Sequence, residues 1–309
     1  MTTPEIATGL AFAGHPWIKR TSAILRWAFP IVLLGFVVHR LGVIGWREIW
    51  AARPSHIGFY LLLVAQFFLQ PIGDLLVYAN LWGSPPSIRA ILRKRFLNSV
   101  MLDYSGELFF YFWARKHLDL AGSVLVHSIK DSNVLSAGAG LAMVYIVGLA
   151  LIAAGGLPVR LGEENWPYIV AGSLPLLLCA VLVLAHNKVT VLSRGQIAAT
   201  FGIHAGRSLS VLAVEFGLWE LSGAMPGWVA SLQFVALRLL VTRLPLLPNK
   251  DLIFLGVGIA VARVVHVPVA PVATVLVILA AADLMLSSTM AGLPWAVEHY
   301  FVLRKKHAA

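Results

Sequence analysis

The feature that most constrains this chain is a series of apolar segments, most of them about 20 residues long, that contain very few charged side chains. A helix of about 20 apolar residues has the length that crosses the hydrocarbon core of a bilayer. Only 12% of the residues are charged, against roughly 25% in soluble domains, so charged side chains cannot cover a water-exposed surface of this size. The sequence excludes a soluble enzyme and predicts an all-α polytopic membrane protein.

Six apolar runs are long enough to be membrane helices, and two further segments are interrupted by polar residues. The six runs cover about 23–45, 57–82, 133–155, 168–186, 208–224 and 269–292. The interrupted segments are 96–115 and the pair 228–247 with 251–266. Twenty residues cannot cross a bilayer twice, but they can form a re-entrant hairpin that is buried in protein. We therefore expect about six to eight membrane helices plus two re-entrant or broken helices, with an interfacial helix at 119–131.

The distribution of basic residues predicts the orientation of the chain. It carries 24 Lys and Arg against 14 Asp and Glu, and the basic residues concentrate in 83–95, 187–207 and the tail 304–309. The positive-inside rule places these segments, and both termini, in the cytoplasm. We expect residues 1–22 to be a cytoplasmic or interfacial segment and 23–303 to be the transmembrane domain of a bacterial inner-membrane protein. The net charge of +10 then reflects orientation and lipid contact, and no basic stripe indicates nucleic-acid binding.

A weak internal repeat relates the two interrupted segments. At an offset of 144 residues, which is the separation of Glu107 from Asp251, Lys94 corresponds to Arg238 and Phe110 to Phe254. In the expected topology the first copy enters the membrane from the cytoplasm and the second from outside. This pattern predicts an inverted-topology repeat with halves of about 57–155 and 207–292, an architecture found in many transporters.

The first interrupted segment contains two carboxylates, Asp103 and Glu107, within apolar sequence. An ionisable side chain at membrane depth costs about 2.5–3.5 kcal/mol on insertion scales, so such residues usually face a cavity or a partner. If the segment is helical, the two carboxylates share one face and could bind a headgroup or a proton. The alternative is that they cap a short helix that begins near Ser105.

The second interrupted segment places Asn249, Lys250 and Asp251 after two prolines. Lys250 is a candidate for binding a lipid phosphate as a point charge, or it pairs locally with Asp251. Upstream, Arg238 and Arg243 are candidates for bidentate phosphate contacts. Their alternative role is to extend toward the membrane interface as topology anchors.

Two further charged positions lie in or beside apolar helices. Glu215 is near the middle of an apolar helix without a local partner, so it is expected either to be protonated or to pair with an arginine such as Arg238. A role in proton coupling is a hypothesis for this residue. Lys130 and Asp131 lie at the mouth of a span, where a structural ion pair is the expected interpretation.

Patterns of known catalytic and metal centres are missing from the sequence. It has no H-E-x-x-H motif, no G-x-S-x-G motif and no aspartate-rich motif for a prenyl diphosphate. The histidines lack metal-ligand spacing, so we expect no metal and no cofactor. An intramembrane enzyme would have to use carboxylates such as Asp103 and Glu107 as acid and base.

The arrangement of these motifs resembles the flippase-like transmembrane family of lysylphosphatidylglycerol synthetases. The residues that carry the resemblance are the motif 103–107 with Arg115 after it, Lys130-Asp131 before a span, and the proline-flanked motif 245–251. The resemblance covers about residues 20–295 and implies a stand-alone membrane protein without the synthetase domain. It implies that these residues line a substrate path.

The sequence thus favours an inner-membrane lipid transporter or flippase that moves a polar headgroup through a central charged cavity. Its expected partners are membrane lipids, with a phospholipid or a lipid-linked headgroup as substrate. An intramembrane enzyme of lipid or polyprenyl-glycan metabolism is the alternative, and an accessory membrane subunit is a third. The oligomeric state does not follow from the sequence.

Overall fold

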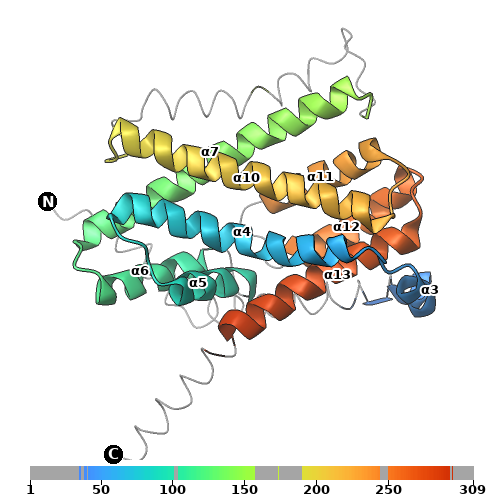
Figure 1. The fold of residues 1–309 in the computed structure, drawn as a ribbon, viewed down its shortest axis with the longest axis horizontal. Coiled ribbons are helices and arrows are strands. Elements are labelled where there is room, and N and C mark those ends of the chain that lie inside the picture. The colour runs from blue at the N-terminus through green and yellow to red at the C-terminus, as the bar shows by residue number, and fades with distance from the viewer. Residues whose placement is uncertain are drawn as a thin grey trace, which may run out of the picture.

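The computed structural model of the protein describes residues 41–100, 104–156, 190–243 and 250–292, with a few isolated positions. These residues form helices and connecting segments, and none of them is in a strand (Figure 1). Four helices are long and apolar enough to cross a membrane: α4 (Ile57–Trp82), α7 (Gly122–Ala153), α10 (Arg194–Ser222) and α13 (Val269–Ser287) with its π-helical extension η2 (Ser288–Gly292). The prediction of an all-helical membrane protein is confirmed in this form. The predicted runs 23–45 and 168–186 lie mostly outside the described residues.

The long helices begin and end at residues suited to those positions. The ring Nδ1 of His56 accepts a hydrogen bond from the Gly58 amide at the start of α4, and Gly83 takes a left-handed conformation at its end. Ser193 and Gln196 form a capping box at the start of α10, and Gly223 ends that helix, again with positive φ. These caps satisfy backbone groups that a helix leaves unpaired at its ends.

Shorter helices lie between the long ones. They are α3 (Trp46–Ala51), α5 (Ile88–Val100), α6 (Ser105–His117), α11 (Trp228–Arg243) and α12 (Lys250–Val264). Along the chain, α4 is followed by the pair α5 and α6 and then by α7. In the same order, α10 is followed by α11 and α12 and then by α13. The sequence of a long helix, two short helices and a long helix therefore occurs twice in the described part of the chain.

The helices α4 and α10 pack against each other along the middle of the molecule. The colour gradient in Figure 1 shows that they run in opposite directions, and that α7 and α13 also run in opposite directions. The pair α5 and α6 lies toward the left of this view, whereas α11 and α12 lie toward the right. Helix α11 packs against α7, and α5 packs against α13.

Apolar side chains form two buried clusters, one at each end of this arrangement. The larger cluster joins α10 to α13, α4 and α3, with Trp219 and Phe234 in ring contact at its centre. The smaller cluster joins the end of α4 to α5, α6 and the start of α7, where Tyr78, Trp82 and Phe110 lie ring against ring. Both clusters hold the short helices against the long ones.

Three sequence-based boundaries were wrong. The basic segment 83–95, predicted as a cytoplasmic loop, includes the first half of α5, and α10 already begins at Arg194 within the predicted loop 187–207. No separate interfacial helix covers 119–131, because α7 is continuous from Gly122 to Ala153. In each case charged side chains that suggested a loop lie on a helix, where ion pairs accommodate several of them.

Candidate functional site

Charged side chains inside the molecule gather in two groups. The first charge cluster comprises Asp74, Lys94, Glu107 and Arg207. The second charge cluster comprises Arg95, Glu215, Arg238, Asp251 and Asp283. Each cluster joins helices that are far apart in the sequence, and each includes a cation and a carboxylate from one pair of short helices.

The first charge cluster is centred on the carboxylate of Asp74 in α4. Its Oδ2 accepts a hydrogen bond of 2.8 Å from Nζ of Lys94 in α5, and its Oδ1 accepts one of 2.9 Å from Nη1 of Arg207 in α10. Glu107, in the first turn of α6, lies 3.6 Å from the same Lys94 nitrogen. Two carboxylates thus face two cations, and the side chains of Asp74, Lys94 and Arg207 are each less than 10% exposed.

Neighbouring groups add further contacts to the first charge cluster, while Oε2 of Glu107 is buried without a hydrogen-bond partner among the described residues. Nη2 of Arg207 donates to the Ser136 hydroxyl in α7, and Nζ of Lys94 lies 5.1 Å from the centre of the Tyr78 ring. Lys94 belongs to α5, outside the four long apolar helices. Burial lowers its pKa, but the carboxylates of Asp74 and Glu107 raise it more, so its pKa lies above the usual range. The ammonium is held in its charged form.

The second charge cluster is centred on Arg238 in α11. Its Nη2 donates a hydrogen bond of 3.1 Å to Oδ1 of Asp251 in α12, and its Nε lies 3.8 Å from Oε1 of Glu215 in α10. Of the two predicted states of Glu215, protonated or paired with an arginine, the structure places Arg238 within ion-pair distance, without a hydrogen bond to Oε1. Arg95 of α5 forms an ion pair with Asp283 of α13 and lies over the Phe67 ring.

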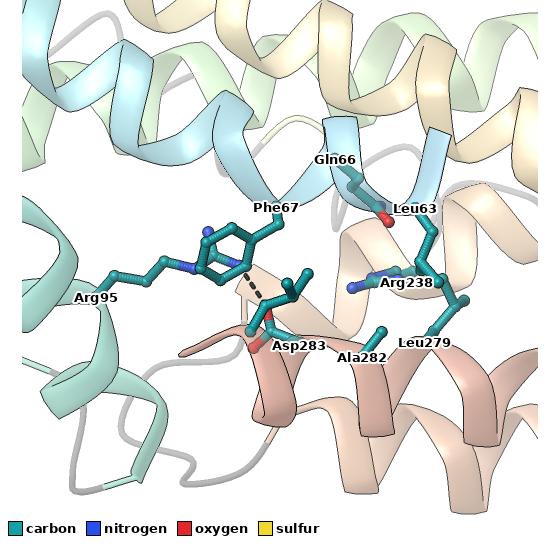
Figure 2. Close-up of a pocket in the computed structure, with 9 residues that line it drawn as sticks. Leu63, Gln66, Phe67, Arg95, Arg238, Leu279, Ala282 and Asp283 are labelled. Atoms are coloured by element: carbon teal, nitrogen blue, oxygen red, sulfur yellow. Dashed lines mark hydrogen bonds and ion pairs between the residues drawn. The ribbon is translucent and has the colours of Figure 1, made fainter. Parts of the chain in front are cut away.

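A small, partly open cavity of about 30 Å³ lies inside the second charge cluster. Its polar lining consists of Gln66, Arg95, Arg238 and Asp283, and leucines, Phe67 and an alanine complete the wall. Figure 2 shows that Gln66 of α4 and Arg238 of α11 point toward the space, and that Arg95 and Asp283 pair at its other edge. Two cations, a carboxylate and an amide thus converge on one small space.

Close backbone contact positions the residues of the first pair of short helices. A Cβ added to Gly106 would lie 2.0 Å from the carbonyl oxygen of Lys94, so α5 and α6 touch at this point. The Gly106 amide donates to Oδ1 of Asn98 at 2.7 Å. Tyr104, which precedes α6, has a left-handed backbone with φ of 72°, a conformation that costs a tyrosine energy and makes a tight entry into the helix. Glu107 is thereby held beside Lys94.

Several predicted path residues lie away from both clusters. Arg115 and Lys130 are exposed, and Arg115 donates to the Tyr111 hydroxyl. Asp131 is buried and lies 3.2 Å from Nζ of Lys130, while its other oxygen accepts from the Thr190 hydroxyl at 2.6 Å. This geometry agrees with the predicted structural ion pair.

The remaining predicted residues belong to the second pair of short helices or fall outside the description. Nζ of Lys250 donates to the Thr242 carbonyl, and the Arg243 guanidinium lies against Gly140 of α7. The ion pairs of Arg238 in the second charge cluster are with Glu215 and Asp251. Asp103 and Asn249 lie outside the described residues.

Sequence reasoning missed four members of the clusters. Lys94, Arg95 and Arg207 were assigned to cytoplasmic loops, and Asp283 was overlooked within an apolar run. The signal for Asp283 was the same as for Glu215: a lone carboxylate in a segment that crosses the membrane is costly and needs a partner. No comparable signal marks the three cations, because a basic residue at a helix end is ordinary.

Metal chemistry finds no support in the described ranges, which contain no group of three or more His, Cys, Asp and Glu residues arranged to hold a metal ion. Comparisons with family models, curated proteins and solved structures found no match to this chain. The two charge clusters and the cavity are the features of the described residues that point to a function.

Proposed function

We propose that this protein is a bacterial inner-membrane transporter that moves the polar headgroup of a lipid, or of a lipid-linked molecule, through the charged interior. The observation that carries the proposal is the cavity inside the second charge cluster, where two arginines and a glutamine meet between long apolar helices. A transporter of this kind needs a polar slot for the headgroup, while the acyl chains stay in the lipid. The flippase-like family that the sequence resembles would provide such an activity.

The proposed architecture is an inverted-topology repeat, with α4 to α7 as one half and α10 to η2 as the other. Lys94 pairs with Glu107, and Arg238 pairs with Asp251, and the two residues of each pair are 13 positions apart. Asp74 on the preceding long helix completes the first set, and Glu215 on the preceding long helix completes the second. The two cation–carboxylate pairs support the offset of 144 residues that relates the two halves, whereas Asp74 and Glu215 are 141 residues apart.

The directions of the helices also support this architecture. Corresponding long helices run antiparallel, both for α4 with α10 and for α7 with α13 (Figure 1). The contact of α11 with α7 has its counterpart in the contact of α5 with α13. A two-fold axis in the membrane plane would relate the halves in this way, and transporters with such repeats bind their substrate where the halves meet.

Glu215 provides the candidate coupling group of this transporter. It is 2% exposed in the middle of the molecule and belongs to the cluster that contains the cavity. Protonation and deprotonation of such a carboxylate would change the charge next to Arg238. A proton taken up on one side of the membrane and released on the other would then supply the driving force.

Reconstitution of the full chain in liposomes tests the proposal. Vesicles contain a phosphatidylglycerol analogue with a fluorescent acyl chain, and a membrane-impermeant reductant reports which leaflet holds the label. We expect the wild-type protein to move label between leaflets. We expect Glu107→Gln combined with Asp251→Asn to slow this movement at least tenfold, because both variants remove the partner of a cation in a pair of short helices.

A control with the same chemistry is available on the surface. Glu48→Gln combined with Asp119→Asn changes two exposed carboxylates and is expected to leave the rate unchanged. Unchanged movement in the cluster variant would overturn the site assignment. Chemically altered lipid, detected by mass spectrometry of the same vesicles, would favour the intramembrane enzyme instead.

A further inference from the structure

The ion pairs of the second charge cluster join three carboxylates to two arginines. Glu215, Asp251 and Asp283 face Arg95 and Arg238. Charged groups on the neighbouring elements are Asp74 of α4, in the first charge cluster, Asp131 of α7, beside Lys130, Arg243 of α11, against Gly140, and Lys250 of α12, which donates to the Thr242 carbonyl. A proton bound by one of the three carboxylates would lower the negative charge around the two arginines by one.

Glu215 is the member of the cluster that is placed to take this proton. Its Oε1 is buried without a hydrogen-bond partner, and its nearest cation, Nε of Arg238, is 3.8 Å away. Asp251 and Asp283, by contrast, each accept a hydrogen bond from an arginine. Proton binding at Glu215 would also leave Arg238 with one charged partner in place of two.

Two guanidinium donors near the same cavity are buried and unpaired. Nε of Arg95 and Nη1 of Arg238 are both enclosed by the protein without an acceptor among the described residues. The Gln66 side chain adds an amide next to Arg238 (Figure 2). Guanidinium groups bind oxyanions through several N–H donors at once, and phosphate oxygens suit this geometry well.

We propose that the second charge cluster binds a phosphodiester anion together with a proton, the anion on Arg95 and Arg238 and the proton on Glu215. The proposal rests on the transport function above and names the chemical group that the transporter recognises. The anion adds one negative charge beside Glu215, and the proton removes one, so each ligand strengthens the binding of the other.

Asp283 is the competitor that the anion has to displace. It holds Arg95 across the cavity and joins α5 to α13. A phosphate oxygen that takes its place would break this contact between the two proposed halves. Anion binding would thus be accompanied by loosening of α5 from α13.

Binding measured by titration calorimetry on the full chain in detergent tests the proposal. The probes are dioctanoyl phosphatidylglycerol, dimethyl phosphate and dioctanoylglycerol, which has no phosphate. Phosphodiesters do not titrate between pH 5 and 9, so any pH dependence in that range belongs to the protein. We expect the affinity for the phosphodiester lipid to fall as pH rises, by up to about tenfold per pH unit for one linked proton.

Three variants distinguish this coupling from a general effect of pH. In Glu215→Gln, we expect the affinity to be independent of pH and close to the wild-type value at low pH. Asp283→Asn, which removes the competitor of Arg95, is expected to bind the anion several-fold more tightly. Glu48→Gln, a change of the same chemistry at an exposed position of α3, should keep the wild-type pH dependence. Thermal unfolding of each variant verifies that it is folded.

The outcomes separate this inference from the transport proposal. Binding of dimethyl phosphate with the same pH dependence would show that the site recognises the phosphate group itself. Binding of the phosphodiester lipid but not of dimethyl phosphate would show that the acyl chains are also needed. Both results support the coupled site. Equal binding of dioctanoylglycerol, or an unchanged pH dependence in Glu215→Gln, would overturn it. Lipid movement in liposomes without pH-linked binding would overturn only the inference, and linked binding without movement would overturn only transport.

Discussion

Replacing Asp74 with asparagine tests the structural role of the first charge cluster. This carboxylate accepts hydrogen bonds from Lys94 at 2.8 Å and from Arg207 at 2.9 Å, and its side chain is 8% exposed. The change Asp74→Asn keeps the size and one acceptor but removes the negative charge. Lys94 and Arg207 then stay buried. Among the described residues, Glu107 is the carboxylate that remains within ion-pair distance of Lys94.

The expected loss follows from the burial of these charges. Removal of one partner from a buried ion pair costs about 3–5 kcal/mol, because the remaining charge is desolvated without compensation. The remaining Asn oxygen can accept from one of the two cations, so we expect the cost to stay within this range rather than double. For a protein of 309 residues, such a loss lowers the midpoint of thermal unfolding by about 5–8 °C.

Thermal unfolding in detergent, followed by tryptophan fluorescence, measures this loss. Asp119→Asn, a change of the same chemistry at an exposed position, is expected to stay within about 0.5 kcal/mol of the wild type. A second variant, Asp74→Asn with Lys94→Met, removes one unpaired cation as well and should recover part of the stability. A midpoint for Asp74→Asn within 1 °C of the wild type would refute the reasoning that an ionised Asp74 holds α4, α5 and α10 together.

Three further substitutions test close contacts in the fold. Gly106→Ala places a methyl group against the backbone oxygen of Lys94 and is expected to abolish the folded protein, seen as loss of a monodisperse peak in size-exclusion chromatography. In Gly258→Ala the new methyl group meets only the end of a leucine side chain, so we expect a folded protein whose free energy of unfolding falls by less than about 1.5 kcal/mol. Equal outcomes for the two glycine variants would contradict this packing. Thr190→Val removes the hydroxyl that donates to buried Asp131 and should cost about 1–3 kcal/mol in the same unfolding assay, and no loss would show that the hydrogen bond is unimportant.

The sequence allowed the interior carboxylates to be interpreted better than the cations. Glu215 was expected to need an arginine because an isolated carboxylate in an apolar helix is costly, and Arg238 does lie beside it. The same reasoning applies to Asp283, where it was not used. Lys94 and Arg207 were wrongly assigned to loops, since the positive-inside rule counts basic residues and cannot tell a solvated lysine from one that is buried against Asp74.

Helix boundaries show a similar division. The apolar run 57–82 matches α4 at both ends, because His56 and Gly83 terminate the helix by local hydrogen bonding and backbone conformation. α7 begins eleven residues before the predicted span 133–155, because its first three turns carry polar side chains that suggested an interfacial segment. The ion pair of Asp131 with its chain neighbour Lys130 was predicted from the sequence. The hydrogen bond that Asp131 accepts from Thr190 comes from a residue that approaches it only in three dimensions, so periodicity alone could not reveal it.

The length of α7 has a consequence for the membrane around the protein. Its 32 residues extend over about 48 Å, at about 1.5 Å per residue, whereas the hydrocarbon core of a bilayer is about 30 Å thick. Even a tilt of about 40°, the upper end of what membrane helices adopt, leaves one turn or more beyond the core. A thicker bilayer would bury that turn and bring the exposed Lys130 closer to the acyl chains. The thickness of the host membrane therefore affects the tilt of α7, and of the helices packed on it, relative to the bilayer normal.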